Sequence, residues 1–241
     1  MKLHFIMLTK QLQSYFTGIS QLLYPVHCNG CGSDLVTKNE LLCFECISKL
    51  PETYFADKPD NYVEKIFYGR INIVAATGLY FFNKDTLLQV LLHQLKYKGN
   101  QQIGEYFGNL MAITLRDSGR FAELHYLIPI PLSKQRLKKR GYNQALAICN
   151  GMATVLQIPV LDNITLRTKH NQTQTNKTRQ QRWDNMQAIF EIENTQQIEH
   201  KNILLVDDVI TTGATLEACG EILLQVAGVQ LYIAVLAVAT N

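Results

Sequence analysis

The order of apolar and polar residues predicts one N-terminal helix followed by alternating strands and helices. Apolar residues from 8 to 23 recur at helical spacing, and Pro25 ends that pattern. Beyond residue 72, short and almost wholly apolar runs alternate with helical segments, which indicates a mostly parallel sheet covered on both faces. We predict strands at 73–82, 126–130, 164–166, 187–191, 202–206 and 230–238, and helices at 85–97, 103–116, 143–156, 177–185 and 214–227.

The same pattern divides the chain into three parts. Residues 1–50 hold the N-terminal helix and a small cysteine-rich module, residues 51–71 mix turn formers with scattered aromatics and suit a connection, and residues 72–241 form an α/β domain. With 241 residues, of which 47% are hydrophobic, the chain is long enough to bury a sizeable core in that domain.

The apolar runs are too short for a membrane protein. The longest nearly uninterrupted run covers residues 231–239, whereas a membrane-spanning helix needs about 18 or more apolar residues. Residues 3–8 form an apolar run shorter than a secretory signal requires, and no small-residue cleavage pattern follows it. We therefore expect a cytoplasmic protein without a membrane span.

Charge is distributed unevenly along the chain. The net charge is +3, from 23 Lys and Arg against 20 Asp and Glu, but residues 124–183 contain ten basic residues and one acid, Asp162. The rest of the chain therefore holds 13 basic and 19 acidic residues, a charge of −6. A basic middle on an acidic body predicts an anionic partner, which could be a polyphosphate, a nucleic acid or an acidic protein surface.

Four cysteines are spaced as the ligands of one metal ion. Cys28 and Cys31 form one Cys-x-x-Cys knuckle, and Cys43 and Cys46 form a second. Two such knuckles can surround one Zn²⁺ tetrahedrally, and four thiolates leave the ion no open position for catalysis. Disulfides would need an oxidising compartment, for which no signal peptide argues. The pattern predicts a small N-terminal zinc-ribbon module whose zinc is structural.

A strand near the C-terminus ends in two acids and a threonine-rich turn. The apolar run 203–206 leads into Asp207 and Asp208. At the carboxyl end of a parallel strand, two carboxylates face the crevice where α/β folds bind ligands, and they can accept hydrogen bonds from ribose hydroxyls. The turn that follows opens a helix, so its N–H groups can cradle a phosphate. Its predicted phosphate-binding residues are Thr211, Thr212, Gly213, Ala214 and Thr215.

Three other interpretations of the acidic pair fit less well. A strand followed by two aspartates also describes an ATPase, but the chain lacks the glycine-rich loop with lysine that holds nucleotide phosphates. Receiver domains carry such a pair after their first strand, whereas only 33 residues follow Asp208 here. The third interpretation is that the acids are incidental, but unpaired carboxylates beside an apolar strand are costly without a ligand or a metal.

These residues resemble a known family. Residues 204–215 resemble the signature of type I phosphoribosyltransferases, and nearly the whole chain resembles the competence-associated ComF/GntX family. One departure is Lys177, where many relatives carry an apolar residue. Further segments that carry the resemblance are 23–25, 95–99, 128–132, Arg136, 140–144, 174–182, Asn185 and Phe190.

The resemblance implies a site for 5-phosphoribosyl 1-diphosphate with Mg²⁺. Asp207 and Asp208 would hold the ribose, and Arg167 and Arg182 would act from a hood that closes on the diphosphate. The pyrophosphate loop would contribute Pro131, Leu132 and Arg140. The expected activity is a phosphoribosyltransferase of nucleotide metabolism, which transfers phosphoribosyl to or from a nitrogen acceptor with exchange of pyrophosphate.

A second function belongs to a different class. The family's association with competence suggests a non-catalytic accessory of DNA uptake and transformation, whose basic middle binds single-stranded DNA or a DNA-uptake helicase. Tyr142 and Trp183 could stack on bases there, although two aromatics make a thin stacking platform. The sequence leaves open which acceptor is used, whether transferase activity is retained and which oligomeric state the protein adopts.

Overall fold

The computed structural model describes residues 27–34, 36, 40–167 and 190–240. The chain divides into two compact units, Met1–Lys49 and Leu50–Asn241, and each is considered by itself. The predicted helices at residues 8–23 and 177–185 lie outside the described residues, as do Arg182 and Trp183.

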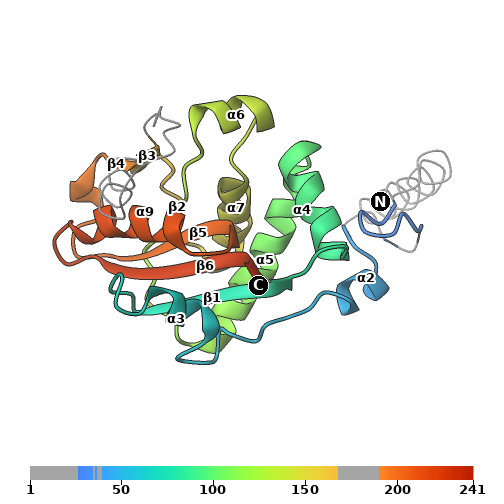
Figure 1. Ribbon diagram of the computed structural model, residues 1–241, viewed down its shortest axis with the longest axis horizontal. Helices are drawn as coiled ribbons and strands as arrows, with labels where there is room; N and C mark the ends of the chain where they lie inside the picture. Colours follow the sequence, from blue (N-terminus) through green and yellow to red (C-terminus); the bar gives the residue numbers. More distant parts are fainter. Residues whose placement is uncertain (1–26, 35, 37–39, 168–189, 241) are drawn as a thin grey trace, which may run out of the picture. The chain divides into compact units, whose positions relative to one another are not determined.

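A parallel sheet forms the centre of the second unit (Figure 1). Its four strands lie in the order β1-β6-β5-β2, and every neighbouring pair is parallel. A separate antiparallel pair, β3 with β4, completes the strands that the structure describes in this unit. The strands are β1 (Ala75–Phe82), β2 (Tyr126–Pro129), β3 (Thr165–Arg167), β4 (Phe190–Ile192), β5 (Asn202–Ile210) and β6 (Gln230–Ala239). The expected mostly parallel sheet is therefore confirmed.

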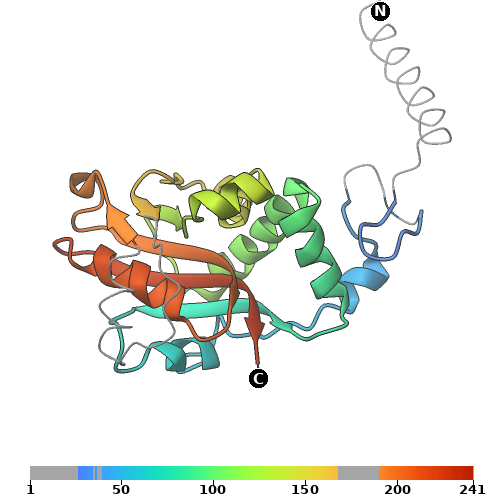
Figure 2. The same ribbon diagram turned by 45° about the horizontal axis from the view of Figure 1, so that its top comes forward.

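Helices cover both faces of this sheet (Figures 1 and 2). One face is covered by α5 (Gln101–Ser118) and α7 (Gln144–Leu156), and the other by α3 (Tyr62–Phe67) and α9 (Ala214–Leu224). The remaining helices in the described residues of this unit are α4 (Leu87–Tyr97), α6 (Lys134–Arg140) and the short 3-10 helix Thr195–Gln197.

Alternation along the strands creates a core on each side of the sheet. Ile203 and Leu205 on β5 belong to one buried cluster together with Leu216 and Leu223 of α9 and Phe67 of α3. Successive side chains of a strand point to opposite faces, so the fully buried Leu204 and Val206 face the helices α5 and α7. Both faces of β5 are buried, which explains its unbroken apolar run.

Three local features differ from the sequence prediction. Strand β5 continues to Ile210 because residues 207–210 keep pairing with β6. Residues 51–71, expected as a connection, contain α3, which begins because the Asn61 side chain accepts hydrogen bonds from the N–H groups of Val63 and Glu64. The basic residues after Leu132, expected as a loop, form α6, whose N-cap Ser133 accepts from the Arg136 N–H.

Glycines let α5 and α7 approach each other closely. A Cβ added to Gly108 would lie 2.1 Å from the Ile148 carbonyl oxygen, and one added to Gly151 would lie 2.0 Å from the Glu105 carbonyl oxygen. These neighbours are backbone atoms of regular helices, so they cannot turn away. The contact fixes α7, and with it the residues at the N-terminus of α7 that face the candidate site.

We predict that Gly108→Ala destabilises the second unit by about 2 kcal/mol, because forcing a methyl group into a packed interior costs about 1 to 3 kcal/mol. In an open helix position, the same change would stabilise by up to about 1 kcal/mol. Urea unfolding measures the difference, with Gln102→Ala on the exposed side of α5 as the control. An unchanged or increased free energy of unfolding in Gly108→Ala would contradict the packing argument.

Candidate functional site

The carboxyl ends of β5 and β2 border a polar cleft of about 270 Å³. Because these strands are neighbours and parallel, the residues that follow them meet at the same edge of the sheet. A smaller hollow of about 50 Å³ adjoins it and is lined by Asp207 and residues 209–216. The cleft itself is lined by Lys96, Ile130, Leu132, Arg136, Arg140, Asn143, Gln144, Ala145, Arg167, Asp207, Asp208, Val209, Thr211 and Thr215.

The two adjacent aspartates have different partners. Asp207 accepts a hydrogen bond from the Asp208 N–H at 2.8 Å, whereas the Asp208 carboxylate pairs with the Lys96 ammonium at 3.0 Å. Burial and the neighbouring Asp208 carboxylate raise the pKa of Asp207 to about 7. One carboxylate is therefore compensated by a cation, and the other retains a proton more readily than a solvated acid.

Lys96 was not among the predicted site residues. It lies in the last turn of α4, and its side chain is 20% exposed against 13% for Asp208. The segment 95–99 did carry part of the family resemblance, but nothing in its local pattern indicates an ion pair with a residue so distant in the chain. The structure therefore adds a cation to the acidic pair.

The threonine turn joins β5 to α9. Gly213 has a φ of 76° and directly precedes the helix, which begins at Ala214. The Ala214 N–H points at the Thr212 hydroxyl at 3.5 Å, and the first N–H groups of a helix have no partners within the helix. Together with the positive end of the helix dipole, these groups suit an anion such as a phosphate.

Three arginines, Arg136, Arg140 and Arg167, line the same cleft. Arg167 extends from β3 with its guanidinium 5.4 Å from the centre of the Phe190 ring, and burial and the nearby Arg136 lower its pKa. Arg140 donates to the Gln144 side chain at 2.6 Å and lies 5.7 Å from the centre of the Tyr97 ring. Neighbouring cations that are partly buried favour an anionic ligand between them.

The structure distributes the predicted binding residues over three hollows. Arg140, Thr211 and Thr215 line the polar cleft, and Thr212, Gly213 and Ala214 line the small hollow. Leu132 lines both the polar cleft and a larger neighbouring cavity, whereas Pro131 lines the larger cavity and not the polar cleft. Arg182, the other predicted arginine, lies outside the described residues.

The neighbouring cavity is larger and more apolar. Its volume is about 770 Å³, and it shares Leu132, Asn143 and Arg167 with the polar cleft. Asn143 fixes this shared wall, since its side chain donates to the Ile130 carbonyl at 2.9 Å and accepts from the Ala145 N–H at 3.0 Å. The remaining lining residues are Pro131, Lys134, Leu137, Tyr142, Leu146, Asp162, Thr165, Leu166 and Glu191.

In the first unit, four cysteines come together. The sulfur atoms of Cys28, Cys31, Cys43 and Cys46 all lie within 4.8 Å of one another, and none of these residues is in a disulfide. The Cys31 and Cys43 sulfurs are 3.7 Å apart. A tetrahedron with metal–sulfur bonds of about 2.3 Å has sulfurs about 3.8 Å apart, so this cluster could hold a metal ion.

Backbone groups orient the sulfurs. The Cys28 sulfur accepts from the Gly30 N–H at 3.4 Å and from the Cys43 N–H at 3.2 Å, which ties the first knuckle to the second. Cys43 is also the N-cap of α2 (Phe44–Ser48). The exposed His27 side chain forms an ion pair with Asp34 at 2.6 Å.

Comparisons with known proteins place the chain in one family. A model of the phosphoribosyl transferase domain matches residues 143–240. Competence protein F of Haemophilus influenzae is 30% identical over 201 residues, which cover 81% of this chain and 83% of that protein. The chain belongs to the ComF family.

Two further relatives cover different shares of this ComF-family chain. Competence protein ComFC of Bacillus subtilis is 27% identical and covers 79% of this chain and 81% of its own length. DNA utilization protein YhgH of Escherichia coli O157:H7 is 29% identical and covers 57% of this chain and 61% of its own length. The matched transferase domain includes the aspartates and the threonine turn, whereas Lys96 precedes it.

Within the described residues, no helix is both long and apolar enough to cross a membrane.

We predict that the first unit binds one zinc ion through its four cysteines and that chelation unfolds it, because a site of this kind contributes directly to folding. Elemental analysis should give one zinc per chain, and limited proteolysis should cut residues 27–49 only after chelation. Cys149→Ala, which changes a buried thiol of α7, is the control and should retain the metal. A metal-free protein with the same resistance to proteolysis would contradict the structural role.

We also predict that stability falls as the pH rises through the range in which Asp207 ionises. Its folded pKa is raised to about 7, whereas a carboxyl of an unfolded chain titrates near about 3.9. Between these values the folded protein binds a proton that the unfolded chain does not, so the free energy of unfolding decreases with pH.

Asp207→Asn should remove most of this decline and raise the free energy of unfolding at pH 8 on the order of 1 to 3 kcal/mol. Urea unfolding at about pH 5 and pH 8 measures both effects, with the exposed Asp57→Asn as the control. If wild type and Asp207→Asn depend on pH in the same way, the raised pKa is wrong.

Proposed function

We propose that this ComF-family protein binds 5-phosphoribosyl 1-diphosphate with Mg²⁺ and transfers the phosphoribosyl group to or from a nitrogen acceptor. The observation that carries the proposal is the composition of one cleft, which is lined by a carboxylate pair, by the turn at the N-terminus of α9 and by arginines. A ribose that bears a phosphate at one end and a diphosphate at the other has the matching groups.

The aspartates and the turn would hold the ribose 5-phosphate half of the donor. Asp207 and Asp208 would accept hydrogen bonds from the two ribose hydroxyls, which relieves the desolvation of the carboxylates. The 5-phosphate would bind at the hollow formed by residues 211–215, where it meets the N–H groups of α9. Both contacts require the turn to keep its place beside the strand end.

The arginines would bind the diphosphate half. Arg136, Arg140 and Arg167 line the same cleft as the aspartates, and guanidinium groups bind phosphate oxygens strongly. Mg²⁺ prefers oxygen ligands, and the carboxylates of Asp207 and Asp208 fit that preference together with the oxygens of the donor. When bound, Mg²⁺ would neutralise negative charge on the pyrophosphate leaving group.

The acceptor would bind in the 770 Å³ cavity that shares a wall with the cleft. The leucines 137, 146 and 166 give it apolar surface, and a pocket of this size fits a flat ring better than it fits ammonia. As the acceptor nitrogen bonds to the anomeric carbon, the bond to the diphosphate breaks, and pyrophosphate leaves with the electron pair. Asp162 and Glu191 line this cavity and could take the proton from the nitrogen.

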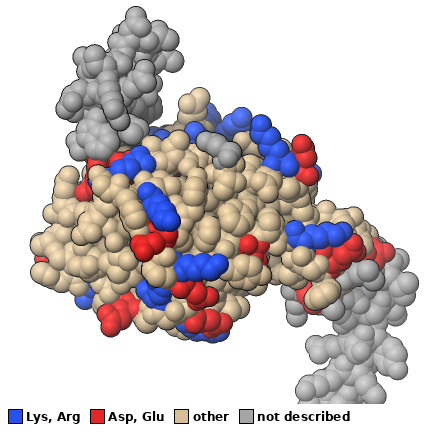
Figure 3. Space-filling model, turned by 60° about the horizontal axis from the view of Figure 1, so that its bottom comes forward, with Lys and Arg blue, Asp and Glu red and all other residues tan. Residues whose placement is uncertain are grey.

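The names of the relatives favour a second candidate, a DNA-binding accessory of competence. The exposed residues of α6, which include Lys134, Arg136, Lys138 and Lys139, could follow a phosphate backbone. On the face drawn in Figure 3, in contrast, basic and acidic side chains are interspersed. The Tyr142 hydroxyl donates to the Leu95 carbonyl, which fixes the ring, and Tyr142 is the only one of the two proposed stacking aromatics within the described residues.

We predict that 5-phosphoribosyl 1-diphosphate with Mg²⁺ stabilises the wild type by about 2.7 kcal/mol at a hundredfold excess over Kd, since it binds the folded state alone. The double variant Asp207→Asn with Asp208→Asn should lose this ligand-induced gain, which is measured against the unliganded stability of the same variant. Thermal unfolding with and without the donor measures the gain, and Asp57→Asn, which leaves the cleft unchanged, should retain it.

Two outcomes would contradict the proposal. The first is the absence of a stability gain at millimolar donor and Mg²⁺. The second is tight binding of single-stranded DNA that is indifferent to the donor and to both aspartates, with no pyrophosphate released for any acceptor. In that case log K should fall with log salt by about 0.7 for each neutralised phosphate, as expected for an extended basic groove.

A further inference from the structure

Arg70 lies between the end of α3 and the threonine turn. In the sequence, however, it is far from the strand ends and from the predicted site residues. Its Nη1 donates to the Thr212 carbonyl at 2.9 Å and to the Ile66 carbonyl at 3.1 Å. The same guanidinium therefore bonds the backbone of α3 and the backbone of the turn.

A buried glutamate sets the direction of this guanidinium. Glu217 lies in the first turn of α9, and its side chain is 2% exposed. The Arg70 Nε donates to the Glu217 Oε1 at 3.0 Å, and Nη2 donates to the Oε2. A planar guanidinium held at both carboxylate oxygens has a fixed orientation, which leaves Nη1 directed at Thr212.

Packing holds α3 against the same turn. A Cβ on Gly213 would lie 2.6 Å from Ile66 Cγ2 and 3.2 Å from the Phe67 ring, so α3 fills the space beside this glycine. The turn is therefore supported by apolar contact at Gly213 and by a hydrogen bond at Thr212. Neither contact involves a group that would touch a ligand.

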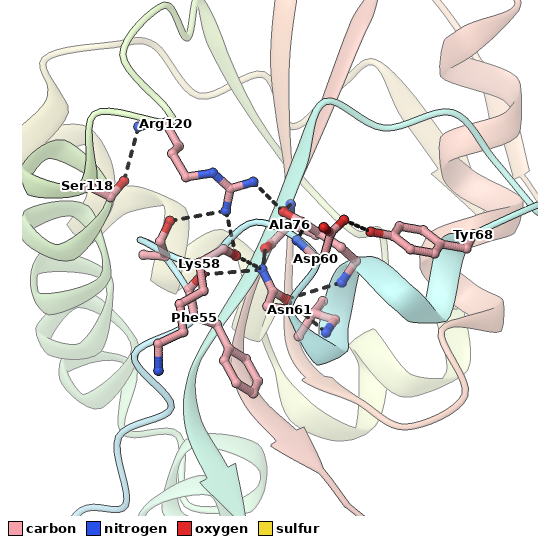
Figure 4. Close-up of polar contacts among 11 residues, drawn as sticks. Phe55, Lys58, Asp60, Asn61, Tyr68, Ala76, Ser118 and Arg120 are labelled. Carbon is pink, nitrogen blue, oxygen red and sulfur yellow. Dashed lines mark hydrogen bonds and ion pairs between the residues drawn. The ribbon is translucent and has the colours of Figure 1, made fainter.

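A second arginine–glutamate pair fixes the other end of α3 (Figure 4). Arg120 pairs with Glu64 at 2.6 Å and donates to the Lys58 carbonyl at 2.9 Å. Glu64 also accepts from the Ala76 N–H of β1, and the buried Asn61 donates to the Ala76 carbonyl. Helix α3 is thus anchored to the edge strand before it reaches the turn.

We infer that Arg70 is a positioning residue that holds the backbone of residues 211–215 in the shape that binds the 5-phosphate. The inference rests on the proposed function for the identity of the ligand, but the restraint itself is a property of the unliganded chain. Arg70 fixes the Thr212 carbonyl, and with it the peptide plane that also carries the Gly213 N–H, while residues 211–215 line the small hollow. Losing the restraint should affect the phosphate end of the ligand and spare the diphosphate end.

The experiment compares Arg70→Ala and Arg70→Lys with Arg120→Ala. Arg120→Ala also leaves a largely buried glutamate, Glu64, without its arginine partner, but Arg120 has no bond to the turn. The first measurement is amide hydrogen exchange in the unliganded protein. The Glu217 N–H, which donates to the Gly213 carbonyl at 2.9 Å, should exchange about tenfold faster in Arg70→Ala, the factor that corresponds to losing about one restraining hydrogen bond, and should be unchanged in Arg120→Ala.

The second measurement is binding of two fragments of the donor. Arg70→Ala should weaken ribose 5-phosphate about tenfold or more, yet leave pyrophosphate with Mg²⁺ within about twofold. Arg70→Lys should be intermediate, because an ammonium can keep a bond to Glu217 but not the fixed fork that reaches Thr212. Arg120→Ala should lower the unfolding temperature and change neither affinity.

The two measurements separate two kinds of failure. If exchange of the Glu217 N–H is the same in Arg70→Ala and Arg120→Ala, or if both fragments weaken equally, Arg70 has only a general stabilising role and the inference is wrong. If the wild type binds neither fragment, the proposed function fails, and the exchange rates alone decide whether Arg70 holds the turn.

Discussion

Two carboxylates cannot lie side by side at the end of a buried strand without compensation, and much of the second unit is arranged around that constraint. Asp208 is compensated by Lys96 from α4, whereas burial beside Asp208 raises the pKa of Asp207 to about 7. Arg167 also lines the cleft, and here a positive charge is disfavoured, because burial and the nearby Arg136 lower its pKa. The unliganded site therefore holds unfavourable charge of both signs, which a ligand with hydroxyl donors and phosphate oxygens would relieve.

The turn beside these acids depends on a part of the chain that carries no ligand-binding group. Gly213 is closed in by α3, and Arg70 joins α3 to both Thr212 and Glu217. A loop in solvent would lose its shape through many accessible conformations, whereas contacts with a helix anchored on β1 limit them. The threonine turn is thus supported on one side by α9, which starts directly after it, and on the other by α3, which precedes the whole sheet in sequence.

Patterns that depend on neighbouring residues could be predicted from the sequence, and patterns that depend on distant ones could not. Short and almost wholly apolar runs located the strands of the main sheet, and the Asp207 and Asp208 pair followed from its position after such a run. Helix α3 was missed because Asn61 resembles a turn former, although the same side chain caps a helix when its oxygen accepts N–H groups. Arg70 and Glu217 are 147 positions apart, so no local signal joins them.

The composition of the cleft also bears on which anion it suits. A DNA strand would bring phosphates to Arg136, Arg140 and Arg167, but its deoxyribose has no pair of vicinal hydroxyls for the two aspartates. Bringing such a strand to the carboxylates would place negative charges beside acids that are already partly desolvated, which raises the cost of ionisation. A phosphorylated ribose offers hydroxyls at that point and phosphates at both ends. Under the proposed function, the acids would favour the ribose donor over DNA, and α6, which contains no acid, would suit DNA contact better than the cleft does.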